Sequence, residues 1–214
     1  MVHKLSSILS CRLANYLGWQ AKTNIMTYGF ELIFGELFKL GLLIIISAYL
    51  GLLMPTVLIL AAAVPFRLIS GGGHCKTYAR CTIVTIMTYL LLSIIAYRIM
   101  PYFDDTLSFI SLLLLTFFTL VVISLWVPGK NPAKDIETPD EKAKFKKLSR
   151  LFLFSWALSC IAVYALVPGI FRVYYVSTAV GVAWQTLFVS PLGYLFLSAV
   201  EKVLDLLTTK KEVN

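Results

Sequence analysis

The chain has 214 residues, of which 59% are apolar and only 14% are charged, against roughly 25% charged residues in an average soluble domain. A soluble protein of this size cannot hide so much apolar surface, so the composition excludes a soluble globular fold and indicates a membrane protein. The net charge of +8 does not indicate a nucleic-acid partner, because no basic stripe lies beside stacking aromatic residues. The four cysteines have neither CxxC pairing nor metal-ligand spacing, which argues against a disulfide framework and a metal site.

Residues 1–24 are predicted to form an amphipathic helix at the membrane interface. Apolar residues recur every three or four positions between His3 and Gln20, and basic and polar residues fall largely off that stripe. No compact apolar run is followed by a small-residue cleavage site, so a signal peptide is not indicated. Such a helix lies among the lipid headgroups. It is either a surface anchor, which we favour, or a docking surface for a membrane-bound substrate.

Six apolar stretches follow, and a helix that crosses a bilayer needs about 20 such residues. They cover residues 25–53, 55–69, 82–100, 107–127, 151–167 and 173–200. The second is short and contains Pro65, which interrupts helical hydrogen bonding, so it is either a tilted crossing or a re-entrant segment; we take it as a crossing. The predicted fold is all-α, a polytopic membrane protein with six transmembrane helices in residues 25–200 and a short interfacial helix in the tail, residues 201–214.

The basic residues predict the orientation of these crossings. With six crossings, most of the 19 Lys and Arg residues fall on the face that holds both termini, and they are densest in the loop at residues 128–150. The positive-inside rule makes this face cytoplasmic. Arg98 and Arg172 fall on the opposite face, beside Asp104 and Asp105.

One segment departs from the composition of a membrane span. It reads Arg67-Leu-Ile-Ser-Gly-Gly-Gly-His74-Cys75-Lys-Thr-Tyr-Ala-Arg80-Cys81. Its consecutive glycines, Gly71, Gly72 and Gly73, favour a tight turn, because they are poor helix formers. A histidine and a cysteine in one loop are the components of a cysteine peptidase, in which the imidazole takes the thiol proton and the thiolate attacks a carbonyl carbon.

Two cysteines are candidates for the nucleophile. Cys75 adjoins His74, and adjacent side chains usually diverge. On a continuous helix Cys81 would lie about 10.5 Å further along the axis, too far for a His–Cys hydrogen bond of roughly 3 Å. A glycine turn that folds His74 back towards a Cys81 in the first turns of the next helix removes this difficulty, so we favour Cys81. The alternative is a loop histidine with two inert thiols.

This segment resembles the motif of the AgrB family, bacterial quorum-sensing membrane peptidases. The family pattern is an arginine, a glycine, a histidine two residues later and a cysteine seven residues after the histidine, matched here by Arg67, Gly72, His74 and Cys81. The resemblance extends to a proline-punctuated basic loop that begins at residues 127–132, and to the number of spans, so it covers nearly the whole chain.

The resemblance implies a membrane-embedded cysteine endopeptidase in a bacterial cell membrane, with its active site on the cytoplasmic side. Such a protein removes the C-terminal part of an AgrD-like propeptide through an acyl-enzyme thioester and promotes cyclisation to a thiolactone or lactone. By position, Cys81 is the nucleophile and His74 the general base. Arg67 either binds a carboxylate of the peptide or anchors the chain at the interface, and Gly72 and its glycine neighbours supply backbone freedom. A homodimer is also implied, and no cofactor is.

Other polar residues lie within the predicted spans. Glu36 and Lys39 are three residues apart and able to pair. Glu31 either orients His74 or receives a basic propeptide, or it is an interface residue in contact with water. Gln185 is placed to hydrogen-bond another helix or a partner subunit. The loop at residues 128–150 is either a solvated loop or a binding site for an acidic propeptide tail.

Two further classes of protein compete with the peptidase. A small transporter or channel would use the charged residues of the first span to line a path, but no internal repeat or pair of broken helices is evident. A membrane scaffold without chemistry would make the glycines and their His and Cys neighbours incidental.

Overall fold

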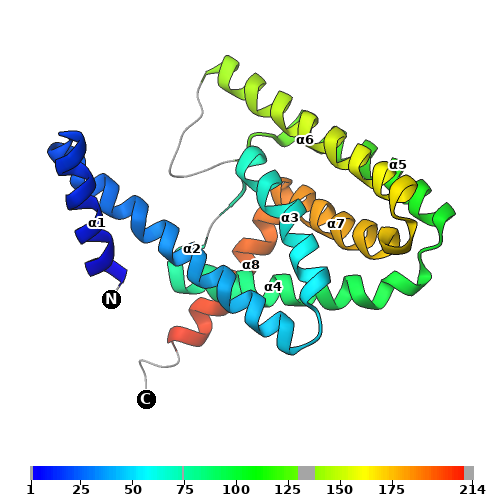
Figure 1. Ribbon diagram of the computed structural model, residues 1–214, viewed down its shortest axis with the longest axis horizontal. Helices are drawn as coiled ribbons and strands as arrows, with labels where there is room; N and C mark the ends of the chain where they lie inside the picture. The colour runs from blue at the N-terminus through cyan, green and yellow to red at the C-terminus, as the bar shows by residue number, and fades with distance from the viewer. Residues whose placement is uncertain (1, 74, 130–137, 210–214) are drawn as a thin grey trace. The chain divides into compact units, whose positions relative to one another are not determined.

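The computed structural model describes residues 2–73, 75–129 and 138–209, and every regular element in these ranges is helical, as predicted. In chain order the elements are α1 (Val2–Leu17), η1 (Gln20–Lys22), α2 (Thr23–Tyr49), α3 (Leu53–Ser70), α4 (Tyr78–Ile99), η2 (Met100–Tyr102), α5 (Asp105–Trp126), α6 (Pro139–Leu166), α7 (Pro168–Val189) and α8 (Pro191–Thr209) (Figure 1).

Within the described residues, five segments are individually long and apolar enough to cross a membrane: η1 with α2, α3, α4 with η2, α5, and α6. The segments α7 and α8 pass the same test only as a pair, and they are bent by 83°. The prediction of an all-helical, multi-pass membrane protein is confirmed. The prediction of one continuous helix over residues 173–200 is wrong, because the chain turns sharply at residue 190.

The bend between α7 and α8 has a local cause. Ser190 is extended (φ −75°, ψ 167°), the conformation that a following proline favours, and Pro191 has no backbone N–H with which to continue α7. Two residues later the backbones almost touch, since a Cβ atom on Gly193 would lie 2.3 Å from the carbonyl oxygen of Phe188. Pro191 is the sequence signal that predicts this break.

We expect Gly193→Ala to destabilise the junction, since the added methyl group would overlap the Phe188 backbone. Overpacking of this kind typically costs about 1–3 kcal/mol, which would lower the thermal unfolding midpoint of the detergent-solubilised protein followed by circular dichroism. Gly169→Ala is the matched control, because open space surrounds that position. An unchanged midpoint for Gly193→Ala would contradict the tight junction.

The first compact unit, residues 2–49, is a pair of helices. The side of α1 that is buried carries small residues four apart, Ser6, Ser10 and Ala14, and the Ser10 hydroxyl hydrogen-bonds that of Thr27 in α2. Small residues let helices approach closely. The predicted apolar stripe is exposed instead, at Leu5, Ile8, Leu9, Leu13, Tyr16 and Leu17. This arrangement leaves the stripe available to lipid.

The charged residues of α2 are paired within this unit. Lys39 donates to Glu36 at 2.6 Å, which confirms the predicted i,i+3 pair. A pair that neutralises itself is poorly suited to line an ion path, so the contact weakens the channel interpretation. Glu31 contacts the imidazole Nδ1 of His3, and its predicted role at His74 stays a prediction.

The second compact unit, described over residues 50–209 apart from the gaps given above, is organised around α7. Figure 1 shows α7 beside α3 and α6. The backbones of α3 and α7 are in contact, since a Cβ atom on Gly181 would lie 2.7 Å from the carbonyl oxygen of Ile59. Polar residues of α7 bond neighbouring helices: the hydroxyl of Thr186 meets that of Thr119 at 3.0 Å. Contacts of this kind satisfy polar groups of α7 that lie inside the helix bundle.

The contacts of α7 show that α3, α5 and α7 run in the same direction, as alternate crossings of a six-span chain do. At one end, the first turns of α5 and α7 meet through the stacked rings of Phe109 and Phe171. At the other end, Gln185 of α7 bonds Ser70 at the end of α3, and Gly129, just beyond α5, bonds the same residue.

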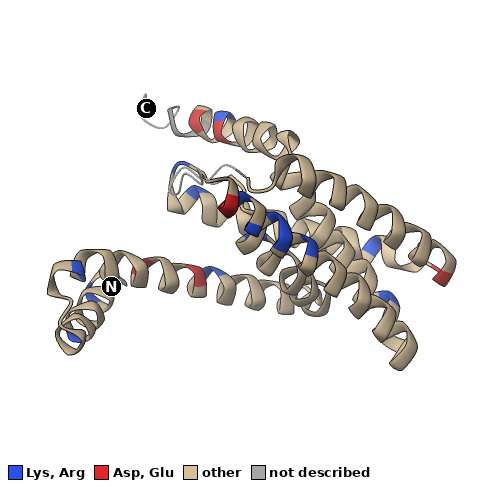
Figure 2. Ribbon diagram, turned by 90° about the horizontal axis from the view of Figure 1, so that it is seen from above, with Lys and Arg blue, Asp and Glu red and all other residues tan. Residues whose placement is uncertain are grey.

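In the second compact unit most charged residues lie towards helix ends, whereas α2 also carries charges near its middle (Figure 2). Lys146 in the first half of α6 donates to the carbonyl oxygen of Ser124 near the end of α5, at 2.7 Å. Asp104 caps the opposite end of α5. The two predicted groups of charges therefore lie at opposite ends of α5, and the assignment of the basic end to the cytoplasm stays a prediction.

The predicted subdivision into residues 1–24, 25–200 and 201–214 also stays a prediction. The helix expected in the tail exists, but it is the second half of α8, which runs through residue 200 without a break. It therefore begins at the proline bend and not at Glu201.

Candidate active site

The glycine turn, residues 71–73, directly follows α3 and uses glycine at each position. Gly71 and Gly72 have φ values of +81° and +143°, a region that disfavours residues with a side chain. A Cβ atom on Gly72 would lie 3.3 Å from the Phe188 ring, and one on Gly73 would lie 2.8 Å from Leu197. Conformation favours glycine at the first two positions, and the third is packed closely against the end of the Leu197 side chain.

Arg67, in the last turn of α3, holds this turn. Its guanidinium donates to the carbonyl oxygen of Gly73 at 2.6 Å and lies over the Phe188 ring, 4.7 Å from its centroid. A stacked, hydrogen-bonded guanidinium suits a fixed position, because its planar fork loses little freedom for each bond that it forms. Neither of the two roles predicted for Arg67 included this internal contact.

Gln185 supports the turn from α7. It is fully buried, and its amide nitrogen donates to the Ser70 hydroxyl at 3.0 Å and to the Gly71 carbonyl oxygen at 2.9 Å. The predicted hydrogen bond from Gln185 to another helix is therefore confirmed. One side chain satisfies two polar groups at the point where α3 ends.

Gly129 closes the turn from the end of α5. Its N–H donates to the Ser70 carbonyl oxygen at 2.8 Å. A Cβ atom there would lie 2.9 Å from the Gly72 nitrogen and 3.1 Å from the Tyr194 hydroxyl. In the sequence, a Pro-Gly pair after an apolar run indicates a turn at Gly129. It does not indicate that Gly129 contacts Ser70 and Gly72. Residues 130–137 of the predicted loop lie outside the described residues.

A cavity of about 680 Å³ lies beside Gly129, between the end of α5 and the junction of α7 and α8. Its lining is mostly apolar and consists of Leu125, Trp126, Pro128, Gly129, Val189, Pro191, Tyr194 and Leu195. Its volume is within the range of about 300–1,000 Å³ that is typical of ligand sites. Gly129 both lines the cavity and contacts the glycine turn, so a bound group would lie next to the turn.

Cys81 lies in the first turns of α4, as predicted. Thr77 caps this helix by accepting from the Arg80 N–H at 3.3 Å, and the Cys81 N–H donates to the Thr77 carbonyl oxygen at 3.0 Å. The Cys81 side chain is partly buried. A helix N-terminus stabilises a thiolate electrostatically. His74, the predicted base, lies outside the described residues, and its contact with Cys81 stays a prediction.

Cys75 is a poor nucleophile in this setting. Burial, together with the nearby Cys81 and Glu201, raises the pKa of the Cys75 thiol to about 11. The raised pKa means that Cys75 is protonated at neutral pH, whereas nucleophilic attack requires the thiolate. This environment supports the choice of Cys81.

The pKa of Cys75 makes its alkylation strongly dependent on pH. Because only the thiolate reacts, we expect the rate of Cys75 alkylation by iodoacetamide to rise about tenfold per pH unit and to keep rising through pH 10. Mass spectrometry of the labelled peptide, with exposed Cys11 as the internal reference, measures this rate. A plateau below pH 9 would show that the pKa is not raised.

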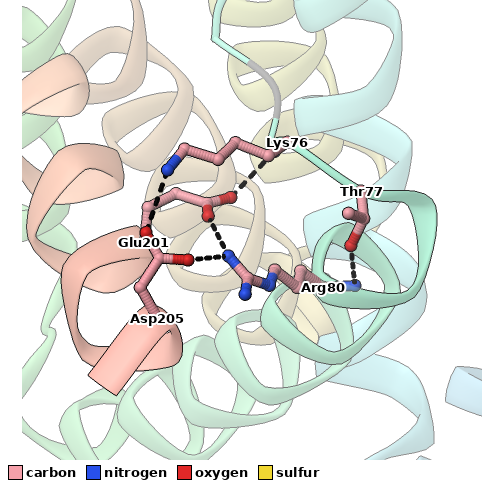
Figure 3. A network of polar contacts seen from close by, with 5 residues as sticks. All are labelled: Lys76, Thr77, Arg80, Glu201 and Asp205. Atoms are coloured by element: carbon pink, nitrogen blue, oxygen red, sulfur yellow. Dashed lines mark hydrogen bonds and ion pairs between the residues drawn. The ribbon is translucent and has the colours of Figure 1, made fainter. Parts of the chain in front are cut away.

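An ion-pair network that the sequence did not predict joins α8 to the start of α4 (Figure 3). Arg80 donates to Glu201 at 2.8 Å and also contacts Asp205, and the Lys76 ammonium lies 2.9 Å from Asp205. The partners are more than 120 residues apart in the chain. No local sequence pattern predicts an ion pair between segments so far apart. The spacing of four between Glu201 and Asp205 predicts only that they share one face of α8.

Comparison with known proteins identifies relatives of this chain. The family model described as accessory gene regulator B (AgrB) matches residues 9–189. A protein of Clostridium perfringens (strain SM101) with an AgrB-like name is 24% identical over 94% of this chain and 97% of its own length. An AgrB-like protein of Clostridium acetobutylicum is 27% identical over 69% of this chain and 68% of its own. No solved structure matches the chain at a significant level.

Proposed function

The chain belongs to the accessory gene regulator B family, and from this premise we propose that it processes a quorum-sensing propeptide as a membrane cysteine endopeptidase. Its substrate is an AgrD-like propeptide, from which it removes the C-terminal part. Its product is a cyclic thiolactone or lactone peptide. Cys81 is the nucleophile and His74 the general base.

The proposed reaction has two acyl transfers. His74 accepts the Cys81 thiol proton, the thiolate attacks the scissile carbonyl carbon, and the C–N bond breaks as the imidazolium gives its proton to the leaving amine. The N-terminal fragment is then held as a thioester. A cysteine or serine within that fragment attacks the thioester, loses its proton to His74 and expels the Cys81 thiolate, which closes the ring.

The observation that best supports this proposal is the placement of the described motif residues on either side of one short loop. Arg67 donates to the glycine turn that contains Gly72, and Cys81 lies in the first turn of the next helix. The cavity of about 680 Å³ adjoins the same turn. Its mostly apolar lining disfavours water beside a thioester, and cyclisation requires the thioester to outlast hydrolysis.

The proposal places the site on the cytoplasmic side of a bacterial cell membrane. Lys146 and the other basic residues at the start of α6 lie at the same end of α5 as Gly129, and the positive-inside rule assigns that end to the cytoplasm. The homodimer implied by the family resemblance is part of the same proposal.

Co-expression with a candidate propeptide, followed by mass spectrometry, tests the function. The proposal predicts a cleaved N-terminal fragment that is lighter by one water molecule than the linear peptide of the same sequence, because ring closure replaces hydrolysis. Hydroxylamine should trap part of the fragment as a hydroxamate. A fragment of linear mass only would support a plain peptidase, and an intact propeptide would contradict the proposal.

A further inference from the structure

We propose that Glu201 of α8 is a positioning residue for Cys81. Its carboxylate bridges two points of the segment that connects the glycine turn to the nucleophile. This inference rests on the proposed function, in which Cys81 attacks the peptide. It adds a residue that neither the motif nor the family match includes, since the match ends at residue 189.

The two oxygens of Glu201 bind different parts of the segment (Figure 3). One accepts from the backbone N–H of Lys76 at 2.8 Å, and the other accepts from the Arg80 guanidinium at 2.8 Å. Lys76 precedes the helix cap Thr77, and Arg80 directly precedes Cys81. One carboxylate thereby fixes both the approach to α4 and its first turn.

Glu201 and Asp205 differ in how far their side chains are buried. The side chains of Glu201 and Arg80 are only 9% and 18% exposed, whereas those of Asp205 and Lys76 are 44% and 64% exposed. An exposed ion pair contributes little. Removal of Glu201 leaves the backbone N–H of Lys76 without its acceptor, although Arg80 keeps its contact with Asp205. The contact that matters for position is therefore the one made by Glu201.

The described residues between the glycine turn and α4 lie outside both helices, so contacts with other elements must fix their position. Among the described residues, positions 72, 73, 75 and 76 lie between α3 and α4, outside the hydrogen-bonded ends of both helices. Arg67 binds the carbonyl oxygen of Gly73, and Glu201 binds the N–H of Lys76. These two contacts fix the chain on both sides of positions 74 and 75, where the proposed base lies in the sequence.

The proline bend makes this contact possible. The 83° turn before α8 brings Leu197 against Gly73 and, one turn further along the same face, Glu201 against Lys76. A continuous helix would carry Glu201 away from the turn. The bend thus allows Glu201 to contact Lys76 and Arg80, and these contacts connect the proposed site to the C-terminal helix.

The test compares Glu201→Ala and Glu201→Gln with Asp205→Ala, in membranes that contain the full chain. Two quantities are measured: cleavage of an AgrD-like propeptide that the unmodified chain processes, and amide hydrogen exchange of the peptide covering residues 75–81. Gln keeps an acceptor oxygen for the Lys76 N–H, but it loses the charge and its amide nitrogen cannot accept from Arg80, which keeps its contact with Asp205. Asp205→Ala removes an acidic partner of the same two residues, through contacts with their side chains.

A positioning role predicts that Glu201→Ala lowers kcat by about 10- to 100-fold with little change in KM, since misplacement by about 1 Å is enough for such a loss. Exchange in residues 75–81 should accelerate about tenfold. Glu201→Gln should keep kcat within about threefold of the unmodified chain, and Asp205→Ala likewise.

Two results would overturn the inference: unchanged exchange in Glu201→Ala, or a loss of kcat in Glu201→Gln equal to that in Glu201→Ala, which would indicate an electrostatic role. Cys81→Ala in the same assay separates this inference from the proposed function. If that variant still cleaves the propeptide, the assigned nucleophile is wrong, while the exchange data still decide whether Glu201 orders the segment.

Discussion

Cys81→Ala is expected to lower the rate of propeptide cleavage by more than about 1,000-fold, because it removes the proposed nucleophile and no second thiolate replaces it. The protein should still insert and accumulate in the membrane, since a partly buried cysteine at the start of α4 contributes modestly to packing. Cleavage of a tagged propeptide, normalised to the amount of membrane-inserted protein, measures the effect.

Cys75→Ala is the matched control for this prediction. Both thiols lie in the same neighbourhood, but the raised pKa of Cys75 keeps it protonated. We expect cleavage by the Cys75 variant to remain within about threefold of the unmodified rate, the range of a small packing change. Inactivity of the Cys75 variant combined with an active Cys81 variant would move the nucleophile to Cys75.

Gly72→Ala is expected to lower cleavage by about 100-fold, the second largest effect. The φ value of +143° belongs to a region that alanine adopts only at a cost of about 1–3 kcal/mol. The added methyl group would also lie 3.3 Å from the Phe188 ring and 3.5 Å from the Arg67 guanidinium. Relief of this crowding must shift Phe188 or Arg67 and with them the glycine turn. Misplacement of reacting groups by about 1 Å lowers a catalytic rate by about 100-fold.

Gly51→Ala is the control for the energetic cost of a positive φ angle without steric crowding. Gly51 also has a positive φ, +69°, but no atom lies within 4 Å of its added Cβ. We expect that variant to lose some stability in thermal unfolding and to keep its cleavage rate. Equal losses of activity in both variants would show that general destabilisation, and not the geometry of the glycine turn, explains the result for Gly72.

The sequence predicted the features that depend on local composition. Apolar length located the crossings, and the helix that carries Cys81 begins three residues before it, at Tyr78, close to the predicted turn. Pro191 indicates a break in the last apolar stretch, but the apolar residues on both sides of it favour a single continuous span. An apolar run indicates contact with lipid or with a protein core, and it contains no information about the direction of the helix.

The parts that were not predicted depend on contacts between distant segments. Gly129 meets Gly72 from the end of α5, and Glu201 meets Lys76 from 125 residues away. Arg67 was placed in the motif, but its partner Phe188 belongs to another helix. Spacing within a segment carries no information about such pairs, because they arise only when the helices pack.

The backbone contact between Gly181 and Ile59 has a consequence for work with the isolated protein. Arg67 and Ser70 belong to one of these two helices, and Gln185 and Phe188 belong to the other. The residues that hold the glycine turn therefore lie on two closely packed helices. Van der Waals packing between main chains that approach this closely contributes to helix association, and it persists when detergent replaces lipid. The glycine turn should therefore keep its shape in a mild detergent micelle, where purified material becomes accessible to direct kinetics.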